Sequence, residues 1–332
     1  MEFCESFDFE IEKIVDTIRS RDVRRIYIQL PEGFQRCTRF ITDRIRVLLG
    51  RDVEVFISAN PSYGSCLVDE YGAKSVNAQL IVHFGHTPYP YQAYNADVLF
   101  IPVEYTGADL SRILGAIGSL CLEENVKLCL AASPQHINLV KSICSAIERC
   151  KCTFRGVVMG CYPVASENCD VLVVVSGGKF HCITQALFEY RKGFSSSSSK
   201  ILCLDPYSYS LWDPSKEAEK MVKIRMWKIF QAANAKRWLI IDGFYGQNRE
   251  NLLVQLTKLL GASNREYHIL KALKLDRETL INVGADSNFD AIVVTSCPYL
   301  VFDFNDFDKP ILTIGEAFAV LNGDTNRYVY PW

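Results

Sequence analysis

Three of the thirteen cysteines stand in a setting that suits metal chemistry. Each follows an apolar, strand-like run and lies in a turn rich in glycine, proline or serine: Cys66 in NPSYGSC, Cys161 in MGCYP and Cys297 in TSCPYL. Open α/β sheets place ligands and reactive groups just beyond the carboxyl ends of their parallel strands. One such cysteine in each third of the chain predicts three equivalent loops that converge on one point.

Three converging thiolates need a cation to balance their charge. The residues alone leave two kinds of centre open, which are a zinc ion with a fourth ligand and a [4Fe–4S] cluster with one iron not bound by cysteine. A CxxC pair, typical of structural zinc sites, is absent around all three cysteines. Ligands gathered from distant loops favour a functional centre over a local structural one.

The other ten cysteines have a different expected role. Most of them lie in apolar segments, as Cys129 does in KLCLAA, Cys203 in ILCLD and Cys144 in the helix-like HINLVKSICSAIERC. A cysteine thiol behaves as a small buried hydrophobic group. We therefore expect these three to be core thiols of a protein that works in a reducing, cytoplasmic interior.

Further polar groups and glycines follow other strand-like runs. His83 and His86 stand in HFGH, directly after QLIV, and the two glycines of SGGKFH (176–181) follow DVLVVV. Glycine lets a ligand approach the backbone closely, as it does in phosphate and nucleotide sites. The acidic turns PEG (31–33) and GEA (315–317) complete the set. Each feature by itself is more often structural, as a hydrogen-bonded histidine pair or a helix cap.

Alternating elements must position these turns. Apolar runs predict buried strands, and apolar residues three or four apart predict amphipathic helices. We expect strands over 25–30, 53–58, 79–84, 97–103, 127–132, 153–159, 170–176, 200–205, 237–242, 290–295 and 309–314. We expect helices over 9–21, 35–49, 110–120, 137–149, 215–235 and 250–260.

This alternation predicts an α/β protein built from parallel sheets that helices cover on both faces. A chain of 332 residues exceeds the usual size of a single hydrophobic core. We predict three related domains, each a small parallel sheet flanked by helices, over 1–108 with Cys66, 109–210 with Cys161 and 211–332 with Cys297.

The composition excludes several classes of protein. A hydrophobic share of 49% and a charged share of 22% exclude wholesale disorder, and a net charge of −2 lacks the basic excess of a general nucleic-acid binder. The N-terminal residues do not resemble a signal peptide, and the apolar runs are too short to span a bilayer. We expect neither membrane association nor direct nucleic-acid binding.

An ordered set of segments resembles one known family. The chain is similar to the archaeal form of the diphthamide-synthesis radical enzymes, the family of diphthamide biosynthesis subunits 1 and 2. The matching segments run in family order along nearly the whole chain: IYIQLPEGF (26–34), SYGSCLVDEYGA (62–73), LIVHFGHTPY (80–89), VLFIPVEY (98–105), VVMGCYP (157–163), VLVVVSGGKFH (171–181), CLDPYS (203–208), YGQNRE (245–250), VVTSCPYLVFDF (293–304) and KPILTIGEA (309–317).

The resemblance implies a 2-(3-amino-3-carboxypropyl)histidine synthase. Family members bind one central [4Fe–4S] cluster through three cysteines, one from each of three domains, and the matching positions are Cys66, Cys161 and Cys297. They cleave S-adenosylmethionine between sulfur and the γ-carbon by a non-classical radical mechanism. The 3-amino-3-carboxypropyl group passes to a histidine of translation elongation factor 2, the first step of diphthamide synthesis. A homodimer and a separate electron donor are also implied.

The resemblance further implies a pocket for S-adenosylmethionine. Its glycines would approach the adenosine or the carboxylate, and its histidines and amide would supply hydrogen bonds. The matching residues are Pro31, Glu32, Gly33, Tyr63, Gly64, His83, His86, Gly177, Gly178, His181, Gly246, Gln247 and Glu316.

Two other functions fit three distant cysteines. Quinolinate synthase also combines three α/β domains with a cluster that leaves one iron open, but it acts on small acids without S-adenosylmethionine. Alternatively, the chain is an accessory subunit that binds elongation factor 2 and keeps a cluster for electron relay. The segments LIVHFGH and SGGKFH favour the diphthamide family, and the intact set of three cysteines favours a catalytic subunit.

Overall fold

The computed structural model describes residues 2–50, 52–122, 125–190, 199–243 and 249–330. The chain divides into two compact units. The first unit consists of residues 1–158, 169–178 and 203–211, and the second of residues 159–168, 179–202 and 212–332. None of the described helices is long and apolar enough to span a bilayer.

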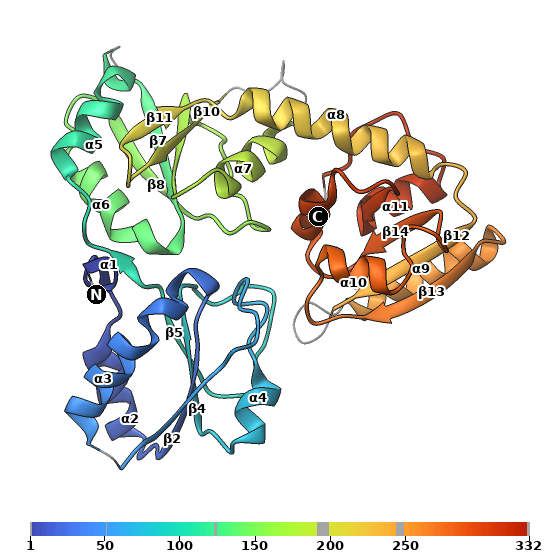
Figure 1. Cartoon of the computed structure of the whole chain (residues 1–332). Coiled ribbons are helices and arrows are strands. Elements are labelled where there is room, and N and C mark those ends of the chain that lie inside the picture. Colours follow the sequence, from blue (N-terminus) through green and yellow to red (C-terminus); the bar gives the residue numbers. More distant parts are fainter. Residues whose placement is uncertain (1, 51, 123–124, 191–198, 244–248, 331–332) are drawn as a thin grey trace. The chain divides into compact units, whose positions relative to one another are not determined.

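A four-stranded parallel sheet belongs to the first unit (Figure 1, blue to cyan). Its strands are β2 (Arg25–Gln29), β3 (Glu54–Ile57), β4 (Leu80–Phe84) and β5 (Val98–Ile101), in the order β3-β2-β4-β5. Helices α2 (Ile11–Ser20) and α3 (Thr38–Leu49) bury one face, and α4 (Glu70–Ser75) lies on the other. Because side chains alternate along a strand, Ile26 and Ile28 face α2 and α3, whereas Tyr27 packs on the opposite side.

The second sheet carries five strands in the order β11-β10-β9-β7-β8. The strands are β7 (Lys127–Ala132), β8 (Lys151–Val157), β9 (Val171–Val175), β10 (Lys200–Asp205) and β11 (Ser210–Trp212). Strand β7 pairs in parallel with both β8 and β9. The helices of this part of the chain are α5 (Leu110–Ile117), α6 (Ile137–Ala146) and α7 (Phe180–Tyr190).

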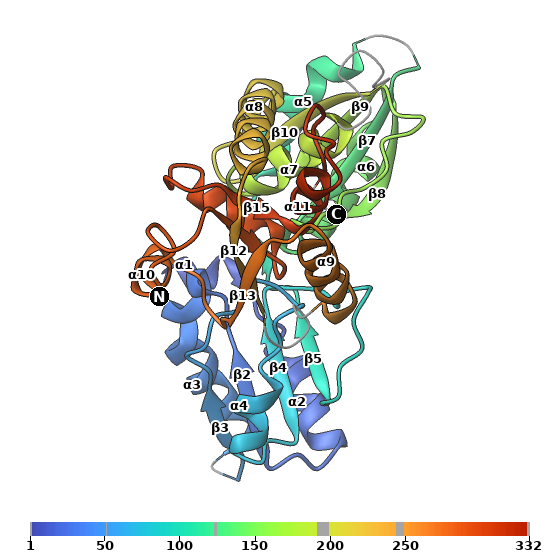
Figure 2. The same cartoon turned by 90° about the vertical axis from the view of Figure 1, so that its right-hand side faces the viewer.

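A third parallel sheet belongs to the second unit (Figure 2). Its strands are β12 (Arg237–Asp242), β13 (Glu266–Lys271), β14 (Ala291–Val294) and β15 (Ile311–Thr313), in the order β13-β12-β14-β15. One apolar core joins a face of the sheet to α8 (Ser215–Ala232), α9 (Glu250–Ala262) and α11 (Ile314–Leu321). A second core joins the other face to α10 (Arg277–Asn282) and the 3₁₀ turns Pro298–Phe304.

The same strand order recurs in all three sheets. The first strand of each sheet lies between the second and the third, and the fourth lies beside the third, as in β3-β2-β4-β5, β8-β7-β9-β10 and β13-β12-β14-β15. Each sheet falls in one of the three predicted blocks, except that β11 crosses the expected boundary after residue 210. The chain divides into two compact units, so its division into three domains stays a prediction.

The apolar runs predicted the strands that carry the sheets, and each of those strands lies within the range expected or within two residues of it. The sequence did not predict β13, whose residues EYHILK form an edge strand that is mostly exposed on both faces. It also did not predict the helices α1 (Glu2–Glu5), α4, α7, α10 and α11, nor the short strand β11 at the edge of the second sheet. The short strands β1 (Phe7–Asp8) and β6 (Glu104–Tyr105), which pair antiparallel, were missed as well. Exposed or short elements lack the long apolar run on which the prediction depends. This reason does not apply to α7, which has 11 residues and is largely buried.

Eight cysteines form four disulfides: Cys4–Cys37, Cys121–Cys150, Cys129–Cys169 and Cys144–Cys152. The prediction that Cys129 and Cys144 are core thiols is therefore wrong, whereas Cys203 is buried and outside the disulfides, as expected. Register explains one of the pairs, because Cys129 on β7 lies opposite Leu172 on β9, and Cys169 stands two residues before the start of that strand.

Alkylation of the unfolded, unreduced protein is expected to modify five of the thirteen cysteines. The eight sulfur atoms held in disulfides do not react, and intact-mass spectrometry counts the added groups. Reduction before alkylation is the control and raises the number to thirteen. Thirteen modifications without reduction would show that no disulfide is present and that Cys129 and Cys144 are thiols, as the sequence predicted. Reduction is also expected to lower stability, since one disulfide contributes roughly 2–4 kcal/mol.

Candidate functional site

The Cys66 loop, residues 58–69, connects β3 to α4 in the first unit. Gln29, the last residue of β2, is fully buried and holds this loop at two points. Its Nε2 donates to the carbonyl of Leu67 at 2.8 Å, and its Oε1 accepts from the backbone N–H of Asp69 at 3.1 Å. The backbone directly after Cys66 is therefore fixed to the central strand of the sheet.

The buried carboxylate of Asp69 organises the rest of the loop. Its Oδ2 accepts from Tyr27 and Asn60, both at 2.7 Å, and from Ser58 at 3.2 Å, while Oδ1 accepts from the N–H of Gly72 at the start of α4. Burial by itself raises the pKa of Asp69, but these hydrogen bonds outweigh it and hold the pKa below its usual value. Asp69 thus stays ionised and ties both ends of the loop together.

Gly64 and Tyr94 lie close to the Cys66 turn. A Cβ on Gly64 would lie 3.6 Å from Cys66 Sγ, so the backbone of residue 64 passes close to the sulfur. The hydroxyl of Tyr94 donates to the carbonyl of Ser65 at 3.0 Å and accepts from the N–H of Tyr89 at 3.0 Å. Burial raises the pKa of Tyr94, and the nearby Cys66 adds to this effect.

The predicted histidine pair lies at the carboxyl end of β4 in the same unit. His83 Nδ1 lies 3.0 Å from Gln29 Oε1, and His83 Nε2 lies 2.9 Å from His86 Nδ1. Gly85 between them has a φ of +80°, and a Cβ there would lie 2.7 Å from the ring of Pro31. The histidine turn therefore packs against the predicted PEG turn, and Gln29 connects both to the Cys66 loop.

The Cys161 turn, residues 159–162, belongs to the second unit. Met159 and Tyr162 exchange two backbone hydrogen bonds, which closes a tight turn around Cys161. A Cβ on Gly160 would lie 2.3 Å from the ring of Phe180, so this position requires glycine. Beyond the turn, the buried amide of Gln185 on α7 accepts from Val164 N–H at 3.0 Å and donates to Val164 O at 2.9 Å.

The Cys297 turn, residues 295–299, follows β14 in the same unit. Thr295 Oγ1 donates to Asp242 Oδ1 at 2.5 Å, and Lys271 Nζ donates to Asp242 Oδ2 at 2.6 Å. Asp242 is the buried last residue of β12, the same position in the third sheet that Gln29 occupies in the first. In both sheets a polar residue at the end of the central strand holds the loop that carries a cysteine.

Phe180, the first residue of α7, joins the two turns of the second unit. Its ring packs against Gly160 next to Cys161, and its centroid lies 4.8 Å from the ring of Tyr299, two residues after Cys297. The expected approach of these two loops thus has a structural basis. The three loops are not equivalent, however, because Cys66 and Cys161 follow the second strand of their sheets and Cys297 follows the third.

The glycine turn after β9 has a structural task in the first unit. A Cβ on Gly177 would lie 2.5 Å from the ring of Tyr207, and Gly178 has a φ of +70°. Position 177 requires glycine because a side chain would clash with the ring of Tyr207. Position 178 favours glycine because its backbone is left-handed. In the second unit, burial lowers the pKa of His181 to about 4, so this imidazole is neutral near pH 7.

Glu316 lies in a closed network rather than in an open pocket. Its side chain is fully buried and accepts from Arg225 Nε at 2.9 Å, Arg225 Nη2 at 2.5 Å and the N–H of Thr313 at 2.8 Å. Together with Thr313 it forms the capping box of α11. These contacts give Glu316 a structural role. Gly246 and Gln247 lie outside the described residues.

Bonding and burial separate the predicted cysteines from the other ten. Eight cysteines are in disulfides, and Cys182 and Cys203 are buried in the apolar core. The remaining three cysteines, Cys66, Cys161 and Cys297, lie outside the disulfides and are half-exposed. These are the three that the sequence selected from their positions after strands.

Cys66 belongs to the first unit, and Cys161 and Cys297 to the second. Over the described ranges, no three His, Cys, Asp or Glu side chains are grouped so that they could hold a metal ion. The convergence of all three sulfur atoms therefore stays a prediction. The thiolate donor set itself suits an iron–sulfur cluster, and the turns that carry it are held in place by buried hydrogen bonds.

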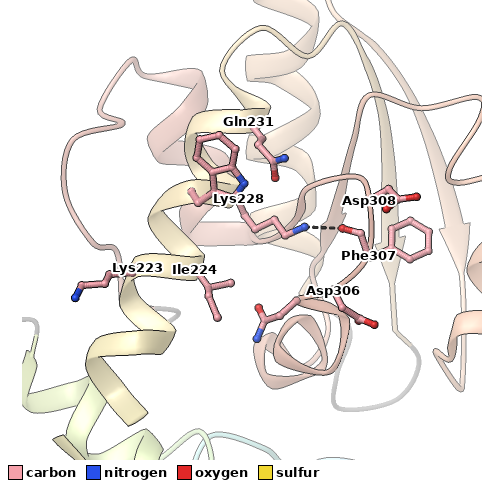
Figure 3. Close-up of a pocket in the computed structure, with 9 residues that line it drawn as sticks. Lys223, Ile224, Lys228, Gln231, Asp306, Phe307 and Asp308 are labelled. Atoms are coloured by element: carbon pink, nitrogen blue, oxygen red, sulfur yellow. Dashed lines mark hydrogen bonds between the residues drawn. The ribbon is translucent and has the colours of Figure 1, made fainter. Parts of the chain in front are cut away.

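A cavity of about 520 Å³ elsewhere in the second unit contains none of the predicted site residues. It lies between α8 and the segment after the 3₁₀ turns, and Figure 3 shows Lys228 reaching across it to donate to the carbonyl of Phe307 at 2.5 Å. Burial and the neighbouring Arg225 lower the pKa of Lys228. The lining residues are Lys223, Ile224, Trp227, Lys228, Gln231, Asn305, Asp306, Phe307 and Asp308.

Comparison with known families decides the assignment. A family model described as putative diphthamide synthesis protein matches residues 30–331, which is nearly the whole chain. The chain belongs to the diphthamide synthesis protein family. The resemblance that the segments around the three cysteines indicated is therefore confirmed.

Curated members of the diphthamide synthesis family align along almost all of the chain. The Schizosaccharomyces pombe protein named 2-(3-amino-3-carboxypropyl)histidine synthase subunit 1 is 26% identical over 98% of this chain and 76% of its own length. The human protein of the same name is 25% identical over 98% of this chain and 74% of its own length. The crystal structure of Dph2 from Pyrococcus horikoshii with a 4Fe-4S cluster has the same fold, with a TM-score of 0.78 at 24% identity over 95% of this chain and 91% of that chain.

Sequence reasoning missed the buried polar residues that hold the cysteine loops. Gln29, Gln185 and Asp242 are each at most 1% exposed. A polar residue that ends an apolar strand was the available signal for Gln29 in RIYIQ and for Asp242 in RWLIID. Gln185 gave no such signal, because it stands inside a helix that the sequence did not predict.

Proposed function

We propose that this chain is a 2-(3-amino-3-carboxypropyl)histidine synthase that carries a [4Fe–4S] cluster on Cys66, Cys161 and Cys297. It transfers the 3-amino-3-carboxypropyl group of S-adenosylmethionine to a histidine of translation elongation factor 2. One observation carries the proposal: these three cysteines are the half-exposed ones outside the disulfides. Membership of the diphthamide synthesis family and the names of the curated relatives support the reaction.

When bound through three thiolates, the cluster supplies an iron open to substrate and an electron for reductive cleavage of the sulfonium. The chain's own residues hold the ligands. Gln29 fixes the Cys66 loop, Phe180 packs against the turns of Cys161 and Cys297, and Asp242 holds Thr295. Ligand turns fixed by buried contacts keep the thiolates in place while the substrate binds and reacts.

The pocket for S-adenosylmethionine includes the turns that meet at the end of the first sheet. Pro31, Gly64, His83 and His86 lie in turns connected through Gln29 and the packing of Gly85. His181, in the second unit, belongs to the predicted set, and burial keeps its imidazole neutral near pH 7. Glu316 is left out of the proposed pocket, because Arg225 and Thr313 occupy its carboxylate.

The recurrent strand order supports three related domains that together enclose the cluster. The curated relatives are named as subunit 1, which supports a complex of at least two chains. We propose a homodimer that receives its electron from a separate donor protein. Elongation factor 2 is the protein substrate.

Anaerobic reconstitution with iron and sulfide is expected to give the visible absorption of a [4Fe–4S] cluster and, after reduction, an EPR signal that changes when S-adenosylmethionine is added. Incubation with elongation factor 2 is expected to yield methylthioadenosine and a modified histidine, both detected by mass spectrometry. The spectra decide whether a cluster binds, and the products decide the reaction. A zinc-containing protein without sulfide, or quinolinate formed from small acids, contradicts the proposal.

A further inference from the structure

Four charged side chains line the cavity between α8 and the segment before β15 (Figure 3). Two of them are already paired with residues that do not line it. Lys223 Nζ lies 2.7 Å from Glu219 Oε1. Asp306 Oδ2 lies 2.9 Å from Arg277 Nη1. The charges left for a ligand are therefore those of one lysine and one aspartate.

Lys228 is the lysine that is left. Its side chain is buried, with 5% exposure, and an ammonium group has three N–H donors. Over the described ranges its hydrogen-bond acceptor is the carbonyl of Phe307, at 2.5 Å. Burial and the positive charge of Arg225 both lower the pKa of Lys228. A buried cation with one acceptor and a cationic neighbour is stabilised by a further acceptor that carries negative charge.

Asp308 is the aspartate that is left. It directly follows Phe307, whose carbonyl binds the ammonium of Lys228, so the two charges lie near each other. Its carboxylate accordingly favours the charged form of Lys228 and opposes the lowering of the pKa. The two side chains nevertheless form no ion pair, and no described residue donates a hydrogen bond to Asp308. A cation and an anion thus line one cavity without contact.

Apolar side chains supply most of the remaining lining. Ile224 and Trp227 of α8 lie on one side, and Phe307 comes from the opposite segment. Trp227 is 56% exposed, so its indole is open to a ligand. The volume of about 520 Å³ lies in the usual range of small-molecule sites, in which a few polar groups orient an apolar body.

We propose that this cavity binds an α-amino acid with an apolar side chain. The carboxylate of the ligand accepts from Lys228, its ammonium donates to Asp308, and its side chain packs against Trp227. An α-amino acid carries its two opposite charges side by side, as the cavity does. None of the lining residues belongs to the cysteine set or to the predicted pocket for S-adenosylmethionine, so the proposal does not depend on the proposed function.

Calorimetric titration of the full-length chain with L-leucine and L-phenylalanine tests the proposal. The better ligand of the two is then compared with the amine that lacks its carboxylate and the acid that lacks its ammonium. For leucine these are 3-methylbutylamine and 4-methylpentanoate. Each is expected to bind roughly tenfold to hundredfold more weakly, the usual effect of losing a hydrogen bond to a charged group. No binding of either amino acid, or equal binding of one analogue, overturns the proposal.

Substitutions assign the binding to this cavity. Asp308→Asn is expected to weaken binding of the amino acid roughly tenfold and to leave binding of the acid analogue unchanged, because that analogue has no ammonium. Lys228→Met is expected to weaken binding of the amino acid and to spare the amine analogue. The matched control is Asp303→Asn, an exposed carboxylate outside the cavity, which is expected to bind as wild type.

Unchanged binding of the amino acid in Asp308→Asn overturns the proposal. Asp308 is exposed and has no described partner, so this variant is expected to fold, and it decides the question even if Lys228→Met, which loses a buried contact, does not fold. The measurements need neither cluster nor elongation factor 2. A negative result therefore leaves the transfer reaction untouched, and the two failures are distinguishable.

Discussion

Replacing Cys161 by alanine is expected to abolish cluster binding and to lower transfer activity by more than about 1000-fold. Two thiolates cannot hold a cubane cluster in a fixed orientation, and without the cluster no electron reaches the substrate. The same result is expected for Cys66→Ala and Cys297→Ala. The measurements are iron and sulfide content after anaerobic reconstitution and modification of elongation factor 2.

Cys203→Ala is the matched control for this loss. Cys203 also lies outside the disulfides but is fully buried on β10, so its replacement is expected to leave iron content and activity close to wild type. Full iron content in Cys161→Ala would show that the ligand set is wrong. Full activity of Cys161→Ala would show that the chain is an accessory subunit.

Replacing Arg225 by methionine is expected to lower the free energy of unfolding by about 3–5 kcal/mol. Arg225 and Glu316 are both fully buried, and the guanidinium also donates to the carbonyl of Ile311 at 2.6 Å. Loss of the arginine leaves an unpaired carboxylate in an apolar core between α8 and α11. Chemical denaturation followed by circular dichroism measures the change.

The exposed ion pair of Arg237 and Asp290 supplies the control. Its side chains are 47% and 32% exposed, so Arg237→Met is expected to lower the free energy of unfolding far less than Arg225→Met does. Glu316→Gln separates the two roles considered for that residue. A lower free energy of unfolding of this variant without ligand supports the structural role of Glu316. Unchanged stability with weaker binding of S-adenosylmethionine would instead support the predicted contact between Glu316 and S-adenosylmethionine.

Much of the fold was predictable because its signal is local. A buried parallel strand must be apolar along its length, and a helix on the sheet must repeat apolar residues every three or four positions, so both patterns are readable in a short window. The turns with Cys66, Cys161 and Cys297 follow such strands, and that position already marked them as a set.

Partners far apart in the chain were not predictable in this way. Arg225 and Glu316 are separated by 91 residues, and the sequence therefore could not show that Glu316 is occupied by an arginine instead of open to a ligand. Cys129 and Cys144 read as apolar core residues, and only packing brings them to Cys169 and Cys152.

The sequence by itself determined the alternation of strands and helices, the turns at the strand ends and the family, because these depend on residue types in local order. Tertiary structure alone decided which cysteines pair, which turns share Phe180 and how Gln29 joins the Cys66 loop to His83. A buried polar group must find its hydrogen-bond partner wherever the folded chain supplies one, and that partner is set by packing rather than by sequence distance.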